Sequence, residues 1–122
     1  MSLTRVILCI VAVTSALASS QAQASTIYNQ IQLTQFAELY PGEIVKICAV
    51  SSSRHVNVNA LTWSLRRKDS RLKQTAGMSP NCRRYFTPAI TGWDRVKVSF
   101  RYRGNVYVAM TFIAIRPAPP RP

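Results

Sequence analysis

Regular alternation of apolar and mostly basic side chains near the end of the chain restricts this segment to a β-strand. Between Arg95 and Arg103 every second residue is apolar, and residues 106–115, which follow Gly104-Asn105, are apolar over most of their length. Successive side chains of a strand point to opposite faces, so this pattern is typical of a strand with one face in a core and the other in solvent. The two segments together predict a β-hairpin.

The length of the hairpin loop decides which side chains are neighbours, because a shift of one residue moves every side chain to the other face. We predict a three-residue loop, Arg103-Gly104-Asn105, with Asn105 in the left-handed conformation. This register pairs only apolar residues on the core face, namely Tyr102 with Val106, Phe100 with Val108, Val98 with Met110 and Val96 with Phe112. The outward face then carries Arg95, Lys97, Ser99 and Arg101 beside Ile113, Thr111, Ala109 and Tyr107, respectively.

Alternation with the same period recurs through the rest of the chain, and no long segment has apolar residues at helical spacing. We expect further strands over residues 27–35, 44–50, 61–66 and 82–87. Residues 67–81 are charged and end in turn-forming residues, which predicts a loop with at most one short strand. Six or seven short strands separated by turns are typical of two sheets packed as a β-sandwich.

The first 24 residues have the order of a cleaved secretory signal peptide. Arg5 precedes an apolar run over residues 6–18, and Ala22-Gln23-Ala24 supplies small residues before a cleavage site, with Ala16-Leu17-Ala18 as a second possible site. The run is shorter than the roughly 20 residues of a membrane-spanning helix, which disfavours the alternative of a retained anchor. Cys9 lies inside the run, which excludes a lipoprotein cysteine.

We therefore expect an exported protein, periplasmic or secreted, with three regions. Residues 1–24 form the signal peptide, 25–116 the β-sandwich domain and 117–122 a proline-rich tail. Two cysteines, Cys48 and Cys82, remain after cleavage, and in an oxidising compartment such a pair predicts a disulfide. A structural zinc site needs four ligands, and the cleaved chain offers only these two cysteines and one histidine, His55. We therefore expect no metal and no cofactor.

The closing strands carry a resemblance to a known class of domains. A series of residues is similar to the closing strands of bacterial immunoglobulin-like and cadherin-like domains. It consists of Phe86-Thr87-Pro88, Gly92, the alternating segment from Asp94, Gly104 and the residues 109–115. Pro41-Gly42-Glu43 before a cysteine-bearing segment, followed by Trp63, resembles the second and third strands of an immunoglobulin fold. The resemblance covers residues 41–63 and 86–115. It implies a single immunoglobulin-like antiparallel β-sandwich of about seven strands, and binding more than catalysis.

The chain departs from that pattern in two respects. Cys48 is out of phase with the apolar face formed by Val45, Ile47 and Ala49, so we expect a disulfide that does not span the sheets behind Trp63. The four acidic residues are too scattered for the calcium sites of cadherin-like domains, and Asp94 is interpreted as a turn or strand-start residue. His55 lies in a polar loop and both cysteines are assigned to the disulfide, so nothing in the sequence favours an enzyme.

Basic residues far outnumber acidic ones, 16 against 4, and loss of the signal peptide lowers the formal charge only from +12 to +11. Such a charge draws a protein towards anions. The candidate anion-binding residues fall into three sets: Arg66, Arg67, Lys68, Arg71 and Lys73; Arg83 and Arg84; and the row Arg95, Lys97 and Arg101, which ends near Arg103 with Tyr107 on the neighbouring strand. Arginine favours bidentate contacts to phosphate, sulfate or carboxylate. The alternative is a solvated sheet face whose arginines discourage edge pairing.

These observations predict an exported, non-enzymatic binding domain with a basic face for an anionic surface or polymer, such as lipopolysaccharide, an acidic glycan, phospholipid or nucleic acid. The alternative is a protein-interaction subunit (an accessory protein, chaperone or inhibitor) that uses a sheet edge or an apolar patch at Tyr107 and Ile113. A hydrolase would need a cleft with converging polar side chains. Convergence of the three basic sets on one face would favour anion binding, and their dispersal would favour a solvated surface.

Overall fold

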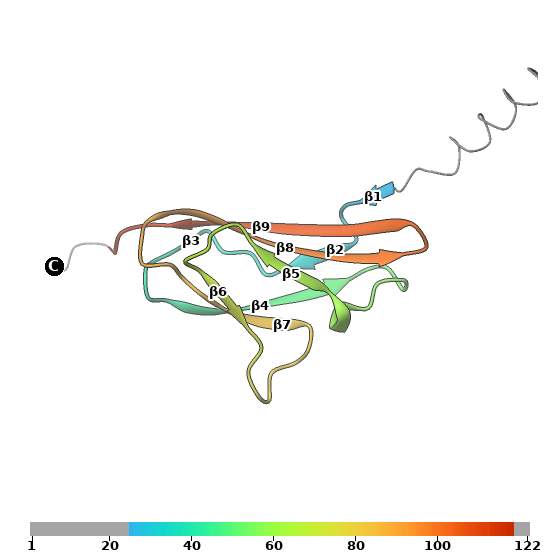
Figure 1. Ribbon diagram of the computed structural model, residues 1–122, viewed down its shortest axis with the longest axis horizontal. Helices are drawn as coiled ribbons and strands as arrows, with labels where there is room; N and C mark the ends of the chain where they lie inside the picture. The colour runs from blue at the N-terminus through green and yellow to red at the C-terminus, as the bar shows by residue number, and fades with distance from the viewer. Residues whose placement is uncertain (1–24, 119–122) are drawn as a thin grey trace, which may run out of the picture.

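The computed structural model describes residues 25–118, which form two packed β-sheets (Figure 1). The strands are β1 (Ser25–Ile27), β2 (Ile31–Leu33), β3 (Glu38–Leu39), β4 (Ile44–Ser51), β5 (Thr62–Leu65), β6 (Arg71–Lys73), β7 (Cys82–Phe86), β8 (Gly92–Tyr102) and β9 (Asn105–Ile115), and a 3₁₀ helix, η1, spans Val58–Ala60. The predicted signal peptide and the last four residues of the predicted tail lie outside the described residues. Within residues 25–118, no helix has the length and apolar character needed to cross a membrane.

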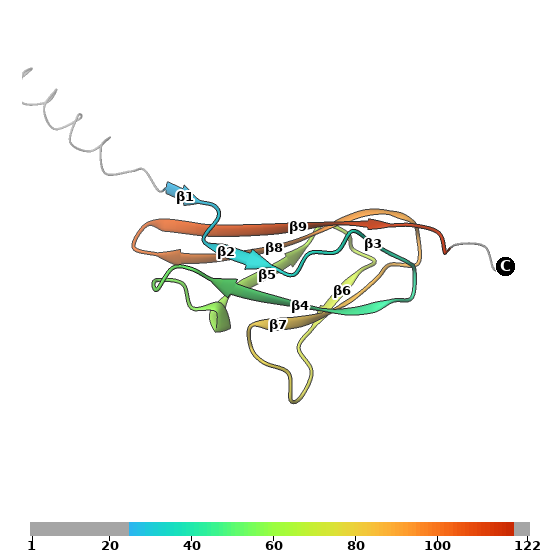
Figure 2. The ribbon, with the colours of Figure 1, turned by 180° about the vertical axis from the view of Figure 1, so that it is seen from behind.

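The strand order defines an immunoglobulin-like sandwich. One sheet has the order β1-β9-β8-β5, with β3 also pairing with β9, and the other has the order β2-β4-β7-β6. Figures 1 and 2 show these sheets as two layers from opposite sides. We refer to them as the β8 sheet and the β4 sheet. The arrangement β2-β4-β7-β6 over β9-β8-β5 matches the ABED and GFC sheets of a seven-stranded immunoglobulin domain, which confirms the predicted fold class.

The core lies between the sheets and is built from the inward residues of alternating strands. Ile47 and Ala49 of β4 are fully buried, as the predicted apolar face of that strand requires. Val96 and Val98 of β8 are buried opposite them, and Tyr85 of β7 is also inaccessible. Burial of these side chains is the main stabilising contribution, about 1.5–3 kcal/mol for each large apolar side chain.

The disulfide Cys48–Cys82 is present and lies within the β4 sheet. The two cysteines are directly opposed on the antiparallel strands β4 and β7, with their Cα atoms 4.0 Å apart. The disulfide therefore joins neighbouring strands and does not span the two sheets, as the phase of Cys48 predicted.

The predicted three-residue hairpin loop is wrong. Tyr102 pairs with Asn105, so the loop contains only Arg103 and Gly104, whose φ angles are 49° and 79°. Two successive left-handed residues are characteristic of a type I′ turn, whose twist matches that of the flanking strands. The pairing of β9 with β8 is consequently shifted by one residue from the predicted register.

This shift exchanges the two faces of β9. Tyr107, Thr111 and Ile113 are buried, whereas Met110 and Phe112 are exposed. The pairing of Val96 with Thr111 places a hydroxyl on the core side, and this hydroxyl donates to Gln35 Oε1 over 3.3 Å. The expected apolar surface patch at Tyr107 and Ile113 does not exist, since both residues belong to the core.

The predicted single strand over residues 27–35 is also wrong, because this segment contributes to both sheets. β1 pairs in parallel with β9, the chain turns at Asn29 with φ 69°, and β2 then pairs antiparallel with β4. β3 returns to the β8 sheet and pairs in parallel with the end of β9. The short strand β6 accounts for the regular part of residues 67–81.

Candidate anion-binding faces

The outer surface of the β8 sheet carries a column of basic side chains, which we call the β8 face. Arg95, Lys97 and Arg101 alternate with buried residues along β8, and they therefore point away from the core. The amide of Arg66 donates to the carbonyl of Arg95 over 3.1 Å, which brings Arg66, just after β5, beside this column. Alternate residues of a strand lie about 6.6–6.8 Å apart, so the column is about 20 Å long.

Exposed aromatic side chains lie next to these cations. The Arg66 guanidinium lies 3.7 Å from the centroid of the Trp93 ring, and its Nη1 donates to the Trp93 carbonyl over 3.0 Å. Phe112, which pairs with Arg95 across the strands, has its ring 6.2 Å from that of Trp93. Trp93 is 47% exposed and Phe112 59% exposed. The β8 face thus combines positive charge with flat apolar rings.

Acidic side chains do not neutralise this face. All four acids are among the described residues, and their ion pairs join Arg67 to Asp69 and Arg116 to Glu38. Asp94 lies on β8 but points into the core, and Glu43 accepts a hydrogen bond from the Tyr40 amide. The cations of the β8 face therefore keep their charge available for a ligand.

The three predicted basic sets do not converge on one face, and this dispersal counts against a single anion-binding surface built from all three sets. From the first set, Arg66 belongs to the β8 face, Arg67 makes a bidentate ion pair with Asp69, and Lys68 is exposed in the β5–β6 loop. From the second set, Arg83 lies on the core side of β7, 5.2 Å from the Trp63 ring, and donates to the carbonyls of Pro80 and Cys82.

At the end of the predicted row, Arg103 occupies the hairpin turn with its guanidinium 5.3 Å from the Tyr102 ring. Tyr107 was expected on the outward face but is only 6% exposed, because the two-residue turn directs it into the core. Tyr107 is therefore removed from the candidate site.

A second group of basic residues lies on the outer surface of the β4 sheet, which we call the β4 face. Lys73 pairs with Arg84, and Arg84 pairs with Lys46, so three cations stand side by side across β6, β7 and β4. Each of the three is exposed, and none has an acid within ion-pairing distance among the described residues. Like charges directly opposed on neighbouring strands are destabilising. Lys46 was not among the residues predicted from the sequence, although pairing of Cys48 with Cys82 places it opposite Arg84.

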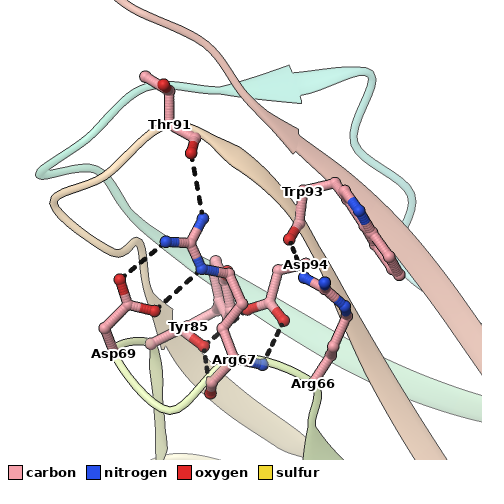
Figure 3. A network of polar contacts seen from close by, with 8 residues as sticks. Arg66, Arg67, Asp69, Tyr85, Thr91, Trp93 and Asp94 are labelled. Carbon is pink, nitrogen blue, oxygen red and sulfur yellow. Dashed lines mark hydrogen bonds and ion pairs between the residues drawn. The ribbon is translucent and has the colours of Figure 1, made fainter.

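A buried carboxylate holds the end of the β8 face in place (Figure 3). Asp94 is inaccessible and accepts hydrogen bonds of 2.6 Å from the hydroxyls of Tyr85 and Ser70. Its other oxygen accepts from the amides of Arg67, over 3.0 Å, and Arg95, over 2.8 Å. Asp94 therefore ties β8 to β7 and to the loop that follows Arg66. From the sequence, Asp94 was predicted only as a turn or strand-start residue.

This network gives the fold a sensitivity to alkaline pH. Burial and the hydrogen bond to Asp94 raise the pKa of the Tyr85 phenol above its ordinary value of 10.0. A group whose pKa is higher in the folded than in the unfolded state contributes fully to stability at pH values below its unfolded pKa. This contribution is lost as the pH rises from the unfolded pKa to the folded pKa. We expect the unfolding free energy of the wild type to fall faster above pH 10 than that of Tyr85→Phe, by up to about 1.4 kcal/mol per pH unit. Urea unfolding between about pH 9 and pH 11 measures this; equal slopes would contradict it.

Within residues 25–118 there is no group of three or more histidine, cysteine, aspartate or glutamate side chains arranged to hold a metal ion. His55 stacks on Tyr102 with the ring centroids 4.6 Å apart. Asp94, the one fully buried acid, has all its contacts within the fold.

Comparison with known proteins adds one structural likeness. No protein-family model matches the chain, and no curated protein sequence matches it. Among solved structures, the chain is similar to the PKD domain of human KIAA0319, with 12% sequence identity and a TM-score of 0.42. That likeness covers 83% of this chain and 92% of the PKD domain. The assignment to the immunoglobulin-like class rests on the strand order described above.

Proposed function

We propose that this protein is an exported, non-enzymatic domain that binds an anionic polymer or surface through the β8 face. The observation that carries the proposal is the column Arg95, Lys97 and Arg101 with Arg66 beside it. The column lies next to the exposed rings of Trp93 and Phe112, and none of its cations forms an ion pair within residues 25–118. The candidate ligands are lipopolysaccharide, acidic glycans, phospholipid head groups and nucleic acid.

Nucleic acid fits both chemical features of the β8 face. Proteins that bind single strands combine a positively charged track for the phosphates with aromatic side chains on which bases stack. The basic column supplies the track, and Phe112 and Trp93 supply the rings. The Arg66 guanidinium, held against Trp93, is a planar donor suited to bidentate contact with phosphate.

Salt dependence of binding tests this function. We expect the wild type to bind a fluorescein-labelled oligonucleotide with an affinity that falls steeply as salt rises, because binding releases counterions. Arg95→Gln with Lys97→Gln removes two phosphate contacts and should lower the slope of log K against log salt by about 1.4 for a single strand. Fluorescence anisotropy at a series of salt concentrations measures the slope.

A charge-matched variant separates the face from the overall charge. Arg54→Gln with Lys68→Gln also removes one arginine and one lysine, at exposed positions outside both basic faces, and should leave the slope close to that of the wild type. Equal slopes for both variants would overturn the β8 face as the site. Heparin, lipopolysaccharide and anionic phospholipid vesicles, titrated in the same way, identify which class of anion binds most tightly.

One feature favours protein interaction as a second candidate function. β1 and β3 cover only the two ends of β9, so no described strand pairs with the outer edge of residues 108–113. A groove of about 480 Å³ runs beside this edge, lined by residues from Tyr28 to Gln35 and by Val108, Met110 and Phe112. An extended segment of a partner could add to this edge as a strand. Protection of amides 108–113 from hydrogen exchange by a copurifying protein would support this function.

A further inference from the structure

The β4 face has the properties of a binding site but lies on the opposite side of the domain from the β8 face. The two sheets form the two layers of the sandwich, and their outer surfaces point in opposite directions (Figures 1 and 2). One ligand on a single surface of the sandwich cannot contact both faces.

Three cations of the β4 face are closer together than stability alone would favour. Lys73, Arg84 and Lys46 occupy directly opposed positions on three adjacent strands, where neighbouring side chains are about 4.5–5.5 Å apart at Cβ. Arg71, two residues from Lys73 on β6, points to the same side. None of these cations forms an ion pair with an acid of the described residues, so no ion pair offsets the repulsion between them.

A hollow beside this row is shaped to receive an anionic group. The β6–β7 loop projects from the β4 sheet (Figure 1), and a hollow of about 290 Å³ separates it from the strands. Lys46, Cys82 and Arg84 of the strands line the hollow together with residues 75–79 of the loop, among which Thr75 and Ser79 carry hydroxyls. A lining with two cations and two hydroxyl residues suits a phosphate group, which accepts several hydrogen bonds at once.

We propose that the β4 face is a second phosphate-binding surface, so that one domain holds two nucleic-acid chains, one on each side of the sandwich. This inference rests on the proposed function, since the first chain occupies the β8 face. It goes beyond the proposed function because a protein with two such faces can join separate polyanion chains. A protein with a single face can bind along a chain but cannot join it to another.

The stoichiometry of binding tests this inference directly. Native mass spectrometry of the mature chain with a single-stranded oligonucleotide of twelve thymidines should detect one protein with two oligonucleotides. Lys46→Gln with Arg84→Gln should reduce this species about tenfold, through loss of charge-assisted contacts, while the species with one oligonucleotide persists. Arg54→Gln with Lys68→Gln, which removes the same charge, should retain the species with two.

A second readout reports bridging in solution. Donor-labelled and acceptor-labelled oligonucleotides mixed with the wild type should show energy transfer, and the Lys46→Gln, Arg84→Gln variant should lose it. Because this variant relieves repulsion between opposed cations, its melting temperature at low salt should equal or exceed that of the wild type, which excludes unfolding as the cause.

The outcomes separate this inference from the proposed function. If the wild type binds only one oligonucleotide, and only Arg95→Gln with Lys97→Gln weakens it, the second site is overturned and the proposed function stands. If no oligonucleotide binds at all, nucleic-acid binding fails on both faces. Bridging of heparin fragments or anionic vesicles without any binding of single-stranded or duplex DNA would also overturn this inference, because the ligand would then belong to a different class.

Discussion

Replacement of Asp94 by alanine should destabilise the fold by about 3–5 kcal/mol, since it leaves several buried donors without an acceptor. The hydroxyls of Tyr85 and Ser70 and the amides of Arg67 and Arg95 all donate to this carboxylate. Each unsatisfied buried group costs roughly 1–3 kcal/mol, and partial relaxation lowers the sum. Urea unfolding followed by tryptophan fluorescence measures the change.

Glu38 provides the control for this prediction. Its carboxylate forms an ion pair with Arg116 over 3.5 Å, and because the Arg116 and Glu38 side chains are 65% and 46% exposed, a contact of this kind contributes little to stability. Glu38→Ala should therefore leave the unfolding midpoint nearly unchanged. If Asp94→Ala and Glu38→Ala have equal effects, the buried network does not stabilise the domain as described. Asp94→Asn, which keeps the shape and one acceptor, should fall between the wild type and the alanine variant.

Removal of the disulfide should have the second large effect. The bridge closes a loop with a sequence separation of 34 residues, and in the chain-entropy model a loop of this length stabilises the fold by about 3–4 kcal/mol. We expect Cys48→Ala with Cys82→Ala to lower the unfolding free energy by that amount, because the unfolded chain gains freedom. The strands β4 and β7 keep their hydrogen bonds and core residues, so the fold should persist.

A reductant distinguishes the disulfide from a packing effect of the cysteines. Dithiothreitol should lower the stability of the wild type towards that of the double variant and leave the variant unchanged. If the oxidised wild type and the double variant have the same unfolding midpoint, the disulfide does not contribute to stability.

The fold class could be predicted from the sequence because alternation is a local property of each strand. β4, β5 and β7 lie within one residue of the expected segments, and β8 begins three residues before Arg95. Alternation does not reveal which sheet a strand joins, since both sheets have the same period. The segment from Ile27 to Gln35 was predicted as a single strand, yet it crosses from one sheet to the other at Asn29. Only packing against β9 and β4 decides that change.

The hairpin register could not be predicted from side-chain pairing alone. Apolar pairing on the core face favoured a loop of three residues, but Arg103 adopts a left-handed conformation that arginine seldom takes, and the loop has two. Exposure of Phe112 and Met110 is the consequence, and it places Phe112 beside Trp93 on the basic surface. The register that local preference disfavours is thus the one that builds the aromatic part of the candidate site.

The candidate sites were predictable only in part. Alternation correctly placed Arg95, Lys97 and Arg101 outward on one strand. The row of Lys46, Arg84 and Lys73 depends on the pairing of three strands, which becomes visible only when the cysteines are recognised as direct cross-strand neighbours. The partners of Asp94 lie on β7 and in the β5–β6 loop, so no local pattern marks it as buried.

The parallel pairing of β1 and β3 with β9 has a mechanical consequence. β1 lies at the end of the sandwich opposite the described C-terminal end of the chain (Figure 1). A force that pulls these two ends apart therefore acts along the paired strands, in shear, so their hydrogen bonds must break together and not one after another. Once those strands yield, the bond between Cys48 and Cys82 still prevents the segment between them from extending. A domain that binds a polymer on each face is loaded across its two sheets. A pull on the two ends of the domain is resisted first by the parallel pairing of β1 and β3 with β9, and then by the disulfide.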